Sequence, residues 1–261
     1  MALSIFTTIT DPDKRGDNFA DAYACYESLA DEVVVIDGKE TWPKEFNWQI
    51  IGEHFQMGYE ACTEEWVIHA DLDFIFHEND YNAIRQACND NTEASALSFW
   101  KYQFVRPDRY NIKSRLIIAV NKGVCGDRIR FNGAGDLCQP TIDGELITPD
   151  DVPEACIPFY NYDFMLKTED QIKDDIGRMD RAYHRHFDRW LYSKDGTAKS
   201  AYAGWLEMVS GRGNKPSKEI PLSDHPEVMQ ETIKNLRPDQ FGYNGFGMFP
   251  DNNYVMEDNK C

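Results

Sequence analysis

Two carboxylates follow a short apolar segment in the first third of the chain, at a spacing that suits a divalent cation. Residues 66–70 are apolar apart from His69, and Asp71 and Asp73 come directly after them. On a regular strand, side chains two residues apart face the same side. Mg²⁺ and Mn²⁺ accept such hard oxygen ligands when they also bind a diphosphate, and the ion then neutralises charge on a leaving nucleoside diphosphate. The segment therefore predicts a Mg²⁺ or Mn²⁺ site at Asp71 and Asp73.

The context of this pair matters more than its spacing. Asp11 and Asp13 have the same spacing, but they lie in a stretch of Asp, Pro, Lys and Gly that is typical of a turn. Asp71 and Asp73 instead end the third strand of a series that alternates between strands and helices. The series predicts strands at 3–9, 32–36 and 66–70 and helices at 18–30 and 43–61.

This order of elements is typical of a parallel sheet that is covered by helices. Ligands bind such sheets beyond the carboxyl ends of the strands. Three polar strand ends are therefore expected to meet in one crevice, at residues 8–11, 37–38 and 71–73.

The rest of the chain predicts a mixed sheet region, a loop region and a helical C-terminal part. A helix is expected at 81–88 and strands at 95–105 and 115–120, whereas 123–151 should form loops because it is rich in Gly, Asp and Pro. Thr168 and Gln171 have the spacing of a capping box, and apolar residues from Ile172 to Trp190 mark a long amphipathic helix behind it. Residues 224–227 open another helix, residues 194–197 and 210–217 look like loops, and the polar tail after Pro250 is expected to be disordered.

Composition and charge narrow the class of protein. The 261 residues, 42% of them hydrophobic, can bury a large core as one large domain or two closely packed ones. No window approaches the roughly 18 apolar residues of a membrane span, and the start lacks a signal peptide pattern, so we expect a soluble, cytoplasmic protein. The net charge of −18 argues against nucleic acid as a partner. Seven scattered cysteines without a Cys-x-x-Cys pair favour reduced thiols.

Residues 65–73 resemble the nucleotide-sugar domain of GT-A glycosyltransferases, particularly family 2-like enzymes. The resemblance includes the elements that precede them in the sequence, a strand that ends in Asp37 and a helix that runs into Gly58. The resemblance continues more loosely to about residue 236, through residues 114–117, 130–133, 158–162 and 224–227. It implies an α/β, Rossmann-like mixed sheet flanked by helices, with a helical C-terminal extension. The nucleotide-sugar half would occupy 1–95, the acceptor half 96–165, and the helical region with its polar tail 166–261.

The same resemblance implies a metal-dependent transfer of a sugar from a nucleotide-sugar donor. Asp73 would bind Mn²⁺ or Mg²⁺ directly, and Asp71 would bind the ion or the ribose. Asp37 would accept a hydrogen bond from the base, which favours a UDP-sugar, and Thr8 would lie beside it. From the residues alone, Asp37 followed by glycine is also an ordinary turn signal. Relatives often have a histidine where this chain has Asn161, which leaves the third protein ligand of the ion open.

An inverting transfer needs a carboxylate that takes the proton of the acceptor hydroxyl, on a glycan or another hydroxyl compound. The loop region offers four candidates: Asp127, Asp136, Asp143 and Glu145. Asp136 is favoured because the family pattern has its acidic residue after a Gly-containing turn.

Two other kinds of protein share parts of this pattern. A nucleotidyltransferase also has a sheet with metal-binding carboxylates, but its Gly-rich loop after the first strand is poorly matched by residues 10–16, which contain one Gly. A non-catalytic protein that binds a nucleotide-sugar or a glycan would keep the fold without turnover. A phosphatase of the Asp-x-Asp type is disfavoured, because its pair follows the first strand.

Histidines and aromatic residues outside these segments have simpler interpretations. His184 and His186 lie two residues apart on a predicted helix, so they face different sides and cannot jointly bind an ion. We expect His186 to be packed and His184 to be exposed. Four aromatic residues have flat faces that could stack on a sugar ring: Trp100, Tyr102, Trp190 and Trp205. Aromatic residues at these spacings are more often part of the core, so we expect them to be buried.

Overall fold

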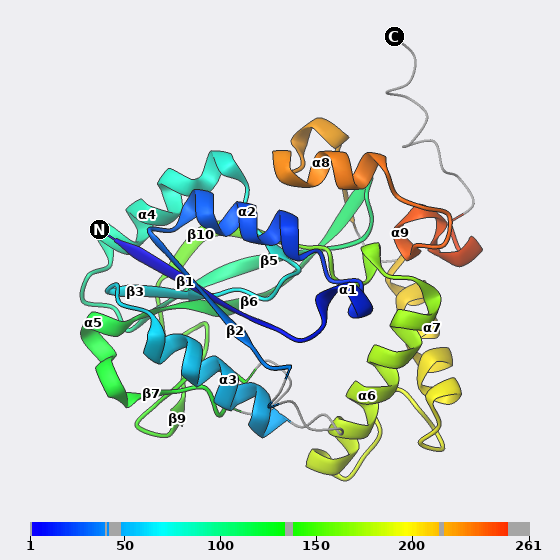
Figure 1. Cartoon of the computed structure of the whole chain (residues 1–261), viewed down its shortest axis with the longest axis horizontal. Helices are drawn as coiled ribbons and strands as arrows, with labels where there is room; N and C mark the ends of the chain where they lie inside the picture. The colour runs from blue at the N-terminus through cyan, green and yellow to red at the C-terminus, as the bar shows by residue number, and fades with distance from the viewer. Residues whose placement is uncertain (1, 40, 42–47, 134–137, 214–216, 250–261) are drawn as a thin grey trace. The chain divides into compact units, whose positions relative to one another are not determined.

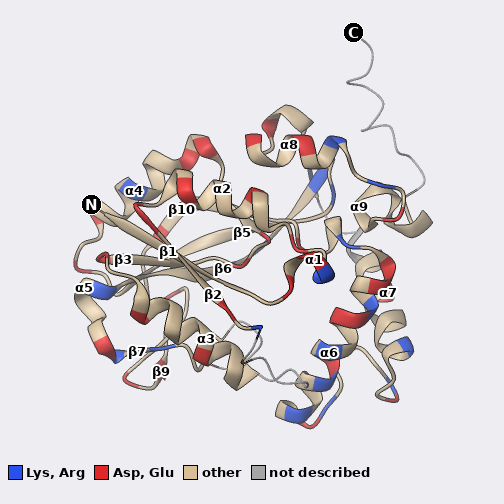
Figure 2. Cartoon of the chain, in the orientation of Figure 1, with Lys and Arg blue, Asp and Glu red and all other residues tan. Residues whose placement is uncertain are grey.

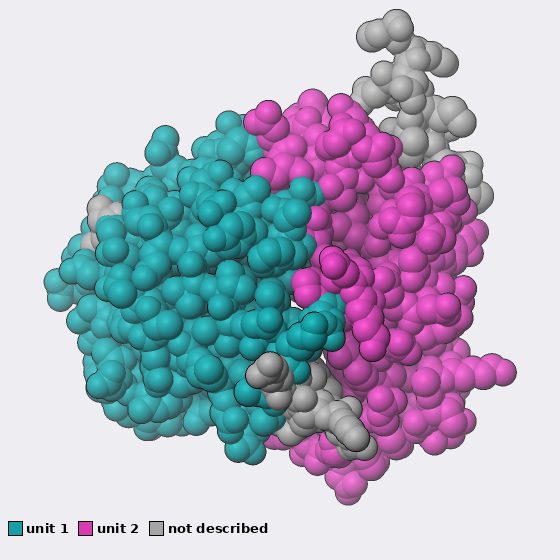
Figure 3. All heavy atoms as spheres, in the orientation of Figure 1, with its two compact units in different colours: residues 1–11, 19–101, 113–160 teal, residues 12–18, 102–112, 161–261 magenta. Residues whose placement is uncertain are grey.

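The computed structural model describes residues 2–39, 41, 48–133, 138–213 and 217–249. The chain forms two compact units, which Figure 3 shows in different colours. Unit 1 comprises residues 1–11, 19–101 and 113–160, and unit 2 comprises residues 12–18, 102–112 and 161–261.

The main sheet has the strand order β2-β1-β3-β6-β5-β10-β4, and β11 pairs with β6. Its strands are β1 (Leu3–Ile9), β2 (Glu32–Asp37), β3 (Trp66–His69), β4 (Phe74–Ile75), β5 (Ala96–Arg106), β6 (Arg109–Asn121), β10 (Glu154–Asn161) and β11 (Lys218–Glu219). Strand β1 pairs in parallel with both β2 and β3, whereas β3 and β6 are antiparallel. The predicted mixed sheet is thus confirmed, with a parallel part formed by the first three strands.

Helices cover both faces of the parallel part, which explains its continuous apolar runs. Every residue of β3 is buried. In Figure 1, α2 (Phe19–Leu29) and α4 (Tyr81–Asp90) lie on one side of these strands and α3 (Trp48–Ala61) on the other. Gly58 lets α3 approach β1, since a Cβ there would come within 2.4 Å of the Phe6 ring. The α/β fold flanked by helices is therefore as predicted.

The region predicted as loops contains a second small sheet. It consists of β7 (Ile129–Arg130), β8 (Thr141–Ile142) and β9 (Glu145–Leu146), all antiparallel, and follows the short helix α5 (Lys122–Cys125). Asp143 and Gly144 connect β8 to β9 with φ angles of 54° and 86°. Positive φ at both central residues is the geometry of a tight hairpin turn, for which Asp-Gly is a preferred sequence. The loop prediction was wrong here because strands of two residues have no detectable periodicity.

Unit 2 is built mainly from helices. They are α1 (Pro12–Arg15), α6 (Glu169–Phe187), α7 (Ala198–Gly213), α8 (Glu227–Lys234) and α9 (Phe241–Asn244). The predicted capping box is present, because Thr168 Oγ1 accepts from the Gln171 backbone N–H while the Gln171 side chain accepts from the Thr168 N–H. The core of unit 2 surrounds the fully buried Trp205, which packs with residues of α6, α7 and α9.

Two helix boundaries in unit 2 differ from prediction. Helix α6 ends at Phe187 rather than at Trp190, because Asp188 takes a left-handed conformation with φ of 53° and such a residue ends a helix. Helix α7 continues to Gly213, whereas residues 210–217 were expected to form a loop. The loop was expected because residues 210, 211 and 213 are serine or glycine. They instead form the last turn of α7, a helix whose apolar residues pack in the core of unit 2.

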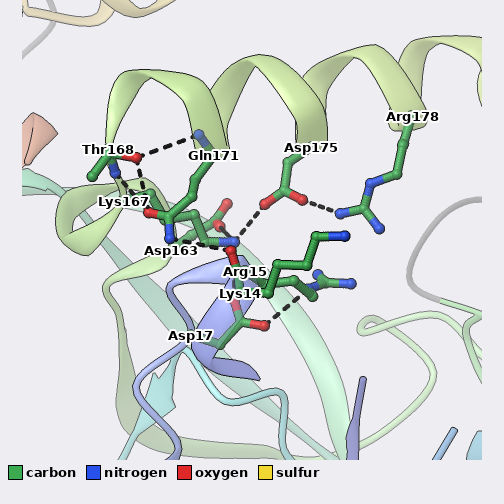
Figure 4. A network of polar contacts seen from close by, with 9 residues as sticks. All are labelled: Lys14, Arg15, Asp17, Asp163, Lys167, Thr168, Gln171, Asp175 and Arg178. Carbon is green, nitrogen blue, oxygen red and sulfur yellow. Dashed lines mark hydrogen bonds and ion pairs between the residues drawn. The ribbon is translucent and has the colours of Figure 1, made fainter. Parts of the chain in front are cut away.

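A buried network of charges holds residues 15–17 against the start of α6 (Figure 4). The Lys167 side chain is only 5% exposed, and its Nζ lies 2.6 Å from Asp175 Oδ2 and 3.0 Å from Asp17 Oδ1. Three cations and three carboxylates take part: Lys167, Arg15 and Arg178 with Asp17, Asp163 and Asp175. The balance of charge compensates for the loss of water around each group.

Replacement of Lys167 by methionine is expected to lower the free energy of unfolding by about 3–5 kcal/mol, because it leaves buried carboxylates without their central cation. Urea unfolding at pH 7 measures this change. Lys173→Met is the matched control, because Lys173 makes an exposed ion pair with Glu169 on the same helix at 2.9 Å and such pairs contribute little. Equal losses in the two variants would contradict a special role for the network.

The pH dependence of this difference provides a second check. Burial lowers the pKa of Lys167, but the charges of Asp163, Asp175 and Asp17 outweigh it and raise that pKa above 10.5. Burial raises the pKa of Asp175, but Lys167, Arg15 and the neighbouring Arg178 outweigh it and lower that pKa below 3.8. The contribution of Lys167 to the free energy of unfolding is therefore lost as the pH rises above 10.5, the ordinary pKa of lysine. The contribution of Asp175 is lost as the pH falls below 3.8, the ordinary pKa of aspartate. The gap between wild type and Lys167→Met should be largest between about pH 4 and pH 10.

Charged residues of both signs are spread over the helices and strand ends in Figure 2, and acidic residues outnumber basic ones by 45 to 27. The six described cysteines are free thiols, and all but Cys156 are buried. Among the described helices, none combines the length and the apolar character that a membrane span requires.

Candidate functional site

The two predicted metal ligands lie on a turn directly after β3. Strand β3 ends at His69, and the Phe74 backbone N–H donates to the Asp71 carbonyl oxygen at 2.8 Å. The chain turns there because β4 lies beside β10 in the sheet, far from β3 in the strand order. The regular-strand geometry that would place both carboxylates on one side therefore does not continue past His69. Both side chains are partly exposed, so the turn presents two carboxylates to solvent.

A buried tyrosine lies under this turn. Tyr26 of α2 is fully buried, and its Oη lies 2.6 Å from the Asp71 carbonyl oxygen and 3.0 Å from that of Phe74. Burial, together with the Cys25 thiol and the carboxylates of Asp73 and Asp71, raises the pKa of Tyr26 well above its ordinary value. The hydroxyl therefore stays protonated and acts as a donor to the turn.

His69 contacts the side chain of the first carboxylate. Its Nε2 lies 3.3 Å from Asp71 Oδ1. The imidazole is buried and stacks on Phe6, with 5.0 Å between ring centroids, and it also packs against Phe55 at 3.9 Å. Asp71 is thus held at its backbone by Tyr26 and contacted at its side chain by His69.

Sequence reasoning missed both residues. His69 gave one signal, since it is a polar residue inside an otherwise apolar strand. Tyr26 gave none, because it falls on the apolar stripe of α2 like an ordinary core residue.

Asp37 lies at the end of β2, next to the end of β1. Asp37 pairs with Ile9 in the parallel register, and the Gly38 N–H donates to the Ile9 carbonyl at 2.9 Å. The Asp37 side chain is exposed, and its Oδ1 accepts from the Lys39 N–H at 2.9 Å. Asp37 therefore forms a local turn, which is the simpler of the two interpretations of Asp-Gly. Thr8 lies one residue before Ile9 and is half-buried.

The parallel register brings these strand ends to one edge of the sheet. Phe6 of β1 pairs with His69 of β3, and Thr8 pairs with Ile36 of β2. Strand β1 is the neighbour of both β2 and β3 and runs parallel to both, so the carboxyl ends of all three point to the same edge of the sheet, with β3 ending level with Phe6. Asp37, Thr8 and Asp71 each lie at or just beyond such an end.

The donor set at this edge fits a hard divalent cation. Among the described residues, no group of three or more His, Cys, Asp or Glu side chains is placed to hold a metal ion. Asp71 and Asp73 provide two hard oxygen donors, which suits Mg²⁺ or Mn²⁺ when water and a diphosphate fill the other positions. Asn161, which left the third protein ligand open, ends β10 and is fully buried.

Three of the four candidate bases are described. Asp127 and Glu145 are exposed, on a short helical turn and on β9. Asp143 is also exposed, forms the hairpin turn with Gly144 and lies 3.4 Å from Arg128 Nη1. Asp136, the favoured candidate, lies outside the described residues.

The two histidines of α6 are arranged opposite to expectation. His184 is half-buried and stacks on Trp190, with 3.9 Å between centroids, whereas His186 is exposed beside Phe187. The reason is that the helix ends at Phe187, so the following segment folds back and places Trp190 on His184. The two imidazoles form no metal-binding group with described residues.

Of the four aromatic residues expected in the core, Trp205 alone is fully buried. Trp100 is half-buried, and its Nε1 donates to Glu154 at 2.5 Å. Tyr102 is half-buried and stacks on Tyr110 at 4.4 Å. The core prediction was wrong for Trp100, Tyr102 and Trp190, which pack against polar or aromatic side chains at the surface.

Comparisons with known proteins add a distant structural likeness. No protein-family model matches the chain, and no curated protein matches it in sequence. The chain is similar to the crystal structure of S. aureus TarS 1-349, with a TM-score of 0.38 and 10% sequence identity over 99% of this chain and 82% of that one. At these values, the likeness assigns neither a family nor an activity.

Proposed function

We propose that the protein is a glycosyltransferase that uses Mn²⁺ or Mg²⁺ to transfer a sugar from a UDP-sugar, with inversion, to a hydroxyl of a glycan or another acceptor. The observation that carries this proposal is the pair Asp71 and Asp73. Both lie on a turn just beyond the buried strand β3, at the sheet edge where nucleotides bind in open α/β folds.

Each residue of the site has a role in this mechanism. Asp73, with Asp71, holds the cation, which when bound neutralises charge on the departing diphosphate. Asp71 alternatively accepts a hydrogen bond from the ribose. Asp37 accepts one from the uracil, and Thr8 lines the same pocket.

The transfer itself requires a base. The acceptor oxygen forms a bond to the anomeric carbon while the bond from that carbon to the diphosphate oxygen breaks, and its electron pair leaves with UDP. The acceptor proton passes to a carboxylate, which we assign to Asp136 on the resemblance of residues 131–136 to the family pattern.

The test of this proposal is turnover of a UDP-sugar. Purified protein with Mn²⁺ should release UDP from at least one member of a UDP-sugar panel, either by transfer or by slow hydrolysis. Binding of UDP-sugars without any release would favour a non-catalytic binding protein. Release of diphosphate from a nucleoside triphosphate and a sugar phosphate would instead indicate a nucleotidyltransferase.

The position of Asp37 predicts which nucleobase the sugar donor contains, namely uracil. UDP with Mn²⁺ should raise the melting temperature more than ADP or GDP does, because a ligand that binds only the folded state stabilises it in proportion to its affinity. Equal shifts for the three nucleotides would remove the claim that uracil is recognised.

Asp37→Asn separates the two roles of Asp37. Asparagine accepts the Lys39 N–H as aspartate does, so the turn is kept, but it is a weaker acceptor for the base. We expect Asp37→Asn to weaken UDP binding about 10- to 100-fold, as for a lost hydrogen bond to a charged group, with Mn²⁺ binding unchanged. Wild-type UDP affinity in this variant would leave Asp37 with its turn role alone.

A further inference from the structure

We propose that Tyr26 is a positioning residue that holds the turn of Asp71 and Asp73 in the geometry that binds the cation. This inference rests on the proposed function, because it concerns the same site. Tyr26 itself touches no substrate; it acts through the backbone of the turn.

Backbone hydrogen bonds also restrain the turn. Residues 70–73 lie outside the strands. Their backbone contacts include the Ala70 N–H to Phe6 carbonyl bond at 3.0 Å and the Phe74 N–H to Asp71 carbonyl bond at 2.8 Å. The Tyr26 hydroxyl lies within hydrogen-bonding distance of the Asp71 carbonyl in the turn and of the Phe74 carbonyl at the start of β4. Its single proton is donated at the shorter distance, 2.6 Å, to the Asp71 carbonyl, with the Phe74 carbonyl as a second acceptor at 3.0 Å, so the hydroxyl holds the backbone of the segment that carries both carboxylates.

The restraint matters because the two carboxylates repel each other. Like charges only two residues apart favour any movement that separates them, whereas a cation requires them to converge. A buried donor that fixes the backbone reduces the reorganisation needed for binding, which is the general benefit of preorganisation. Tyr26 is fully buried, so water does not readily replace its hydroxyl when that group is removed.

Tyr59 provides a matched control. Its side chain is also buried, at 1% exposure, and its hydroxyl donates to the Gly126 carbonyl at 2.8 Å, away from the turn. Tyr26→Phe and Tyr59→Phe thus each remove one oxygen atom of a buried side chain and the hydrogen bond that it donates to the backbone. Comparable losses of stability are expected for the two variants, so any difference in cation binding reports on the turn.

The experiment measures Mn²⁺ binding by electron paramagnetic resonance, with Mn²⁺ alone as the probe, and hydrogen exchange of the Phe74 amide. Tyr26→Phe should raise the Kd for Mn²⁺ about three- to tenfold, as expected for the loss of one hydrogen bond, and should speed exchange at Phe74. The kcat for transfer should fall by a similar factor, while UDP affinity without metal stays unchanged. Tyr59→Phe should match wild type in all four measurements.

Equal Mn²⁺ affinities in Tyr26→Phe and Tyr59→Phe, or unchanged exchange at Phe74, would overturn the proposal. Wild-type protein gives a test that needs no variant, because Mn²⁺ should further protect the Phe74 amide if the turn and the cation are coupled. Failure of the proposed function has a different signature: wild type would turn over no UDP-sugar, whereas the Phe74 exchange rates would still show whether Tyr26 orders the turn.

Discussion

Asp73→Asn is expected to lower the rate of sugar transfer by about 1,000-fold or more. The cation provides several kcal/mol of stabilisation to the charge that develops on the leaving diphosphate, and each 1.36 kcal/mol corresponds to about tenfold in rate. An amide is a weaker ligand than a carboxylate, so most of this stabilisation should be lost. The measurement is kcat with a UDP-sugar and Mn²⁺.

Asp13→Asn is the matched control. Asp13 belongs to the other Asp-x-Asp pair of the chain, and it lies exposed on α1 rather than beyond β3. Transfer by Asp13→Asn should equal that of wild type. The melting temperature of Asp73→Asn should stay close to that of wild type, because the side chain is partly exposed on a turn. A variant that fails to fold would indicate a structural role for Asp73 instead.

Removal of the cation should have the same effect as removal of its ligand. EDTA is expected to abolish transfer by the wild type, and Mn²⁺ or Mg²⁺ added in excess should restore it. Full activity in EDTA would contradict the metal-dependent mechanism, whichever residues bind the sugar.

Asp136→Asn is expected to reduce transfer by roughly 100- to 10,000-fold, the range for loss of a general base. UDP affinity should stay near that of wild type, because a base that faces the acceptor does not contact the nucleotide. Asp136→Asn would then lower the rate of sugar transfer without changing the affinity for UDP. UDP binding by calorimetry and transfer under single-turnover conditions measure the two effects.

The stereochemistry of the product checks the same assignment independently. In-line attack by an activated hydroxyl forms the new bond on the face opposite the departing UDP, so the anomeric configuration must invert. Asp143→Asn is the control, because asparagine also tolerates the positive φ of the hairpin turn and should leave transfer unchanged. A retained configuration, or normal transfer by Asp136→Asn, would remove Asp136 from the mechanism and direct attention to Asp127, Asp143 and Glu145.

The sequence determined the elements whose signals are local. The strand at 66–70 was predicted because these residues are apolar apart from His69 and are followed by two aspartates, and helix α6 was predicted from its capping box, whose bonds join residues only three apart. The parallel arrangement of β1, β2 and β3 followed from their alternation with helices. Because parallel strands end at one edge, the grouping of Asp37, Thr8 and Asp71 was also predictable.

The tertiary structure alone decided the features that depend on contacts between distant residues. Tyr26 lies 45 residues from Asp71 in the sequence, and Lys167 lies 150 residues from Asp17, so neither contact has a local signal. The turn at Asp71 exists because the next strand joins a distant part of the sheet, and a strand pattern cannot reveal that change of direction. Local hydrogen bonds and side-chain periodicity depend on residues that are close in the sequence. The positions of the Asp71 and Asp73 carboxylates depend instead on which strands pair and which helix packs beneath them.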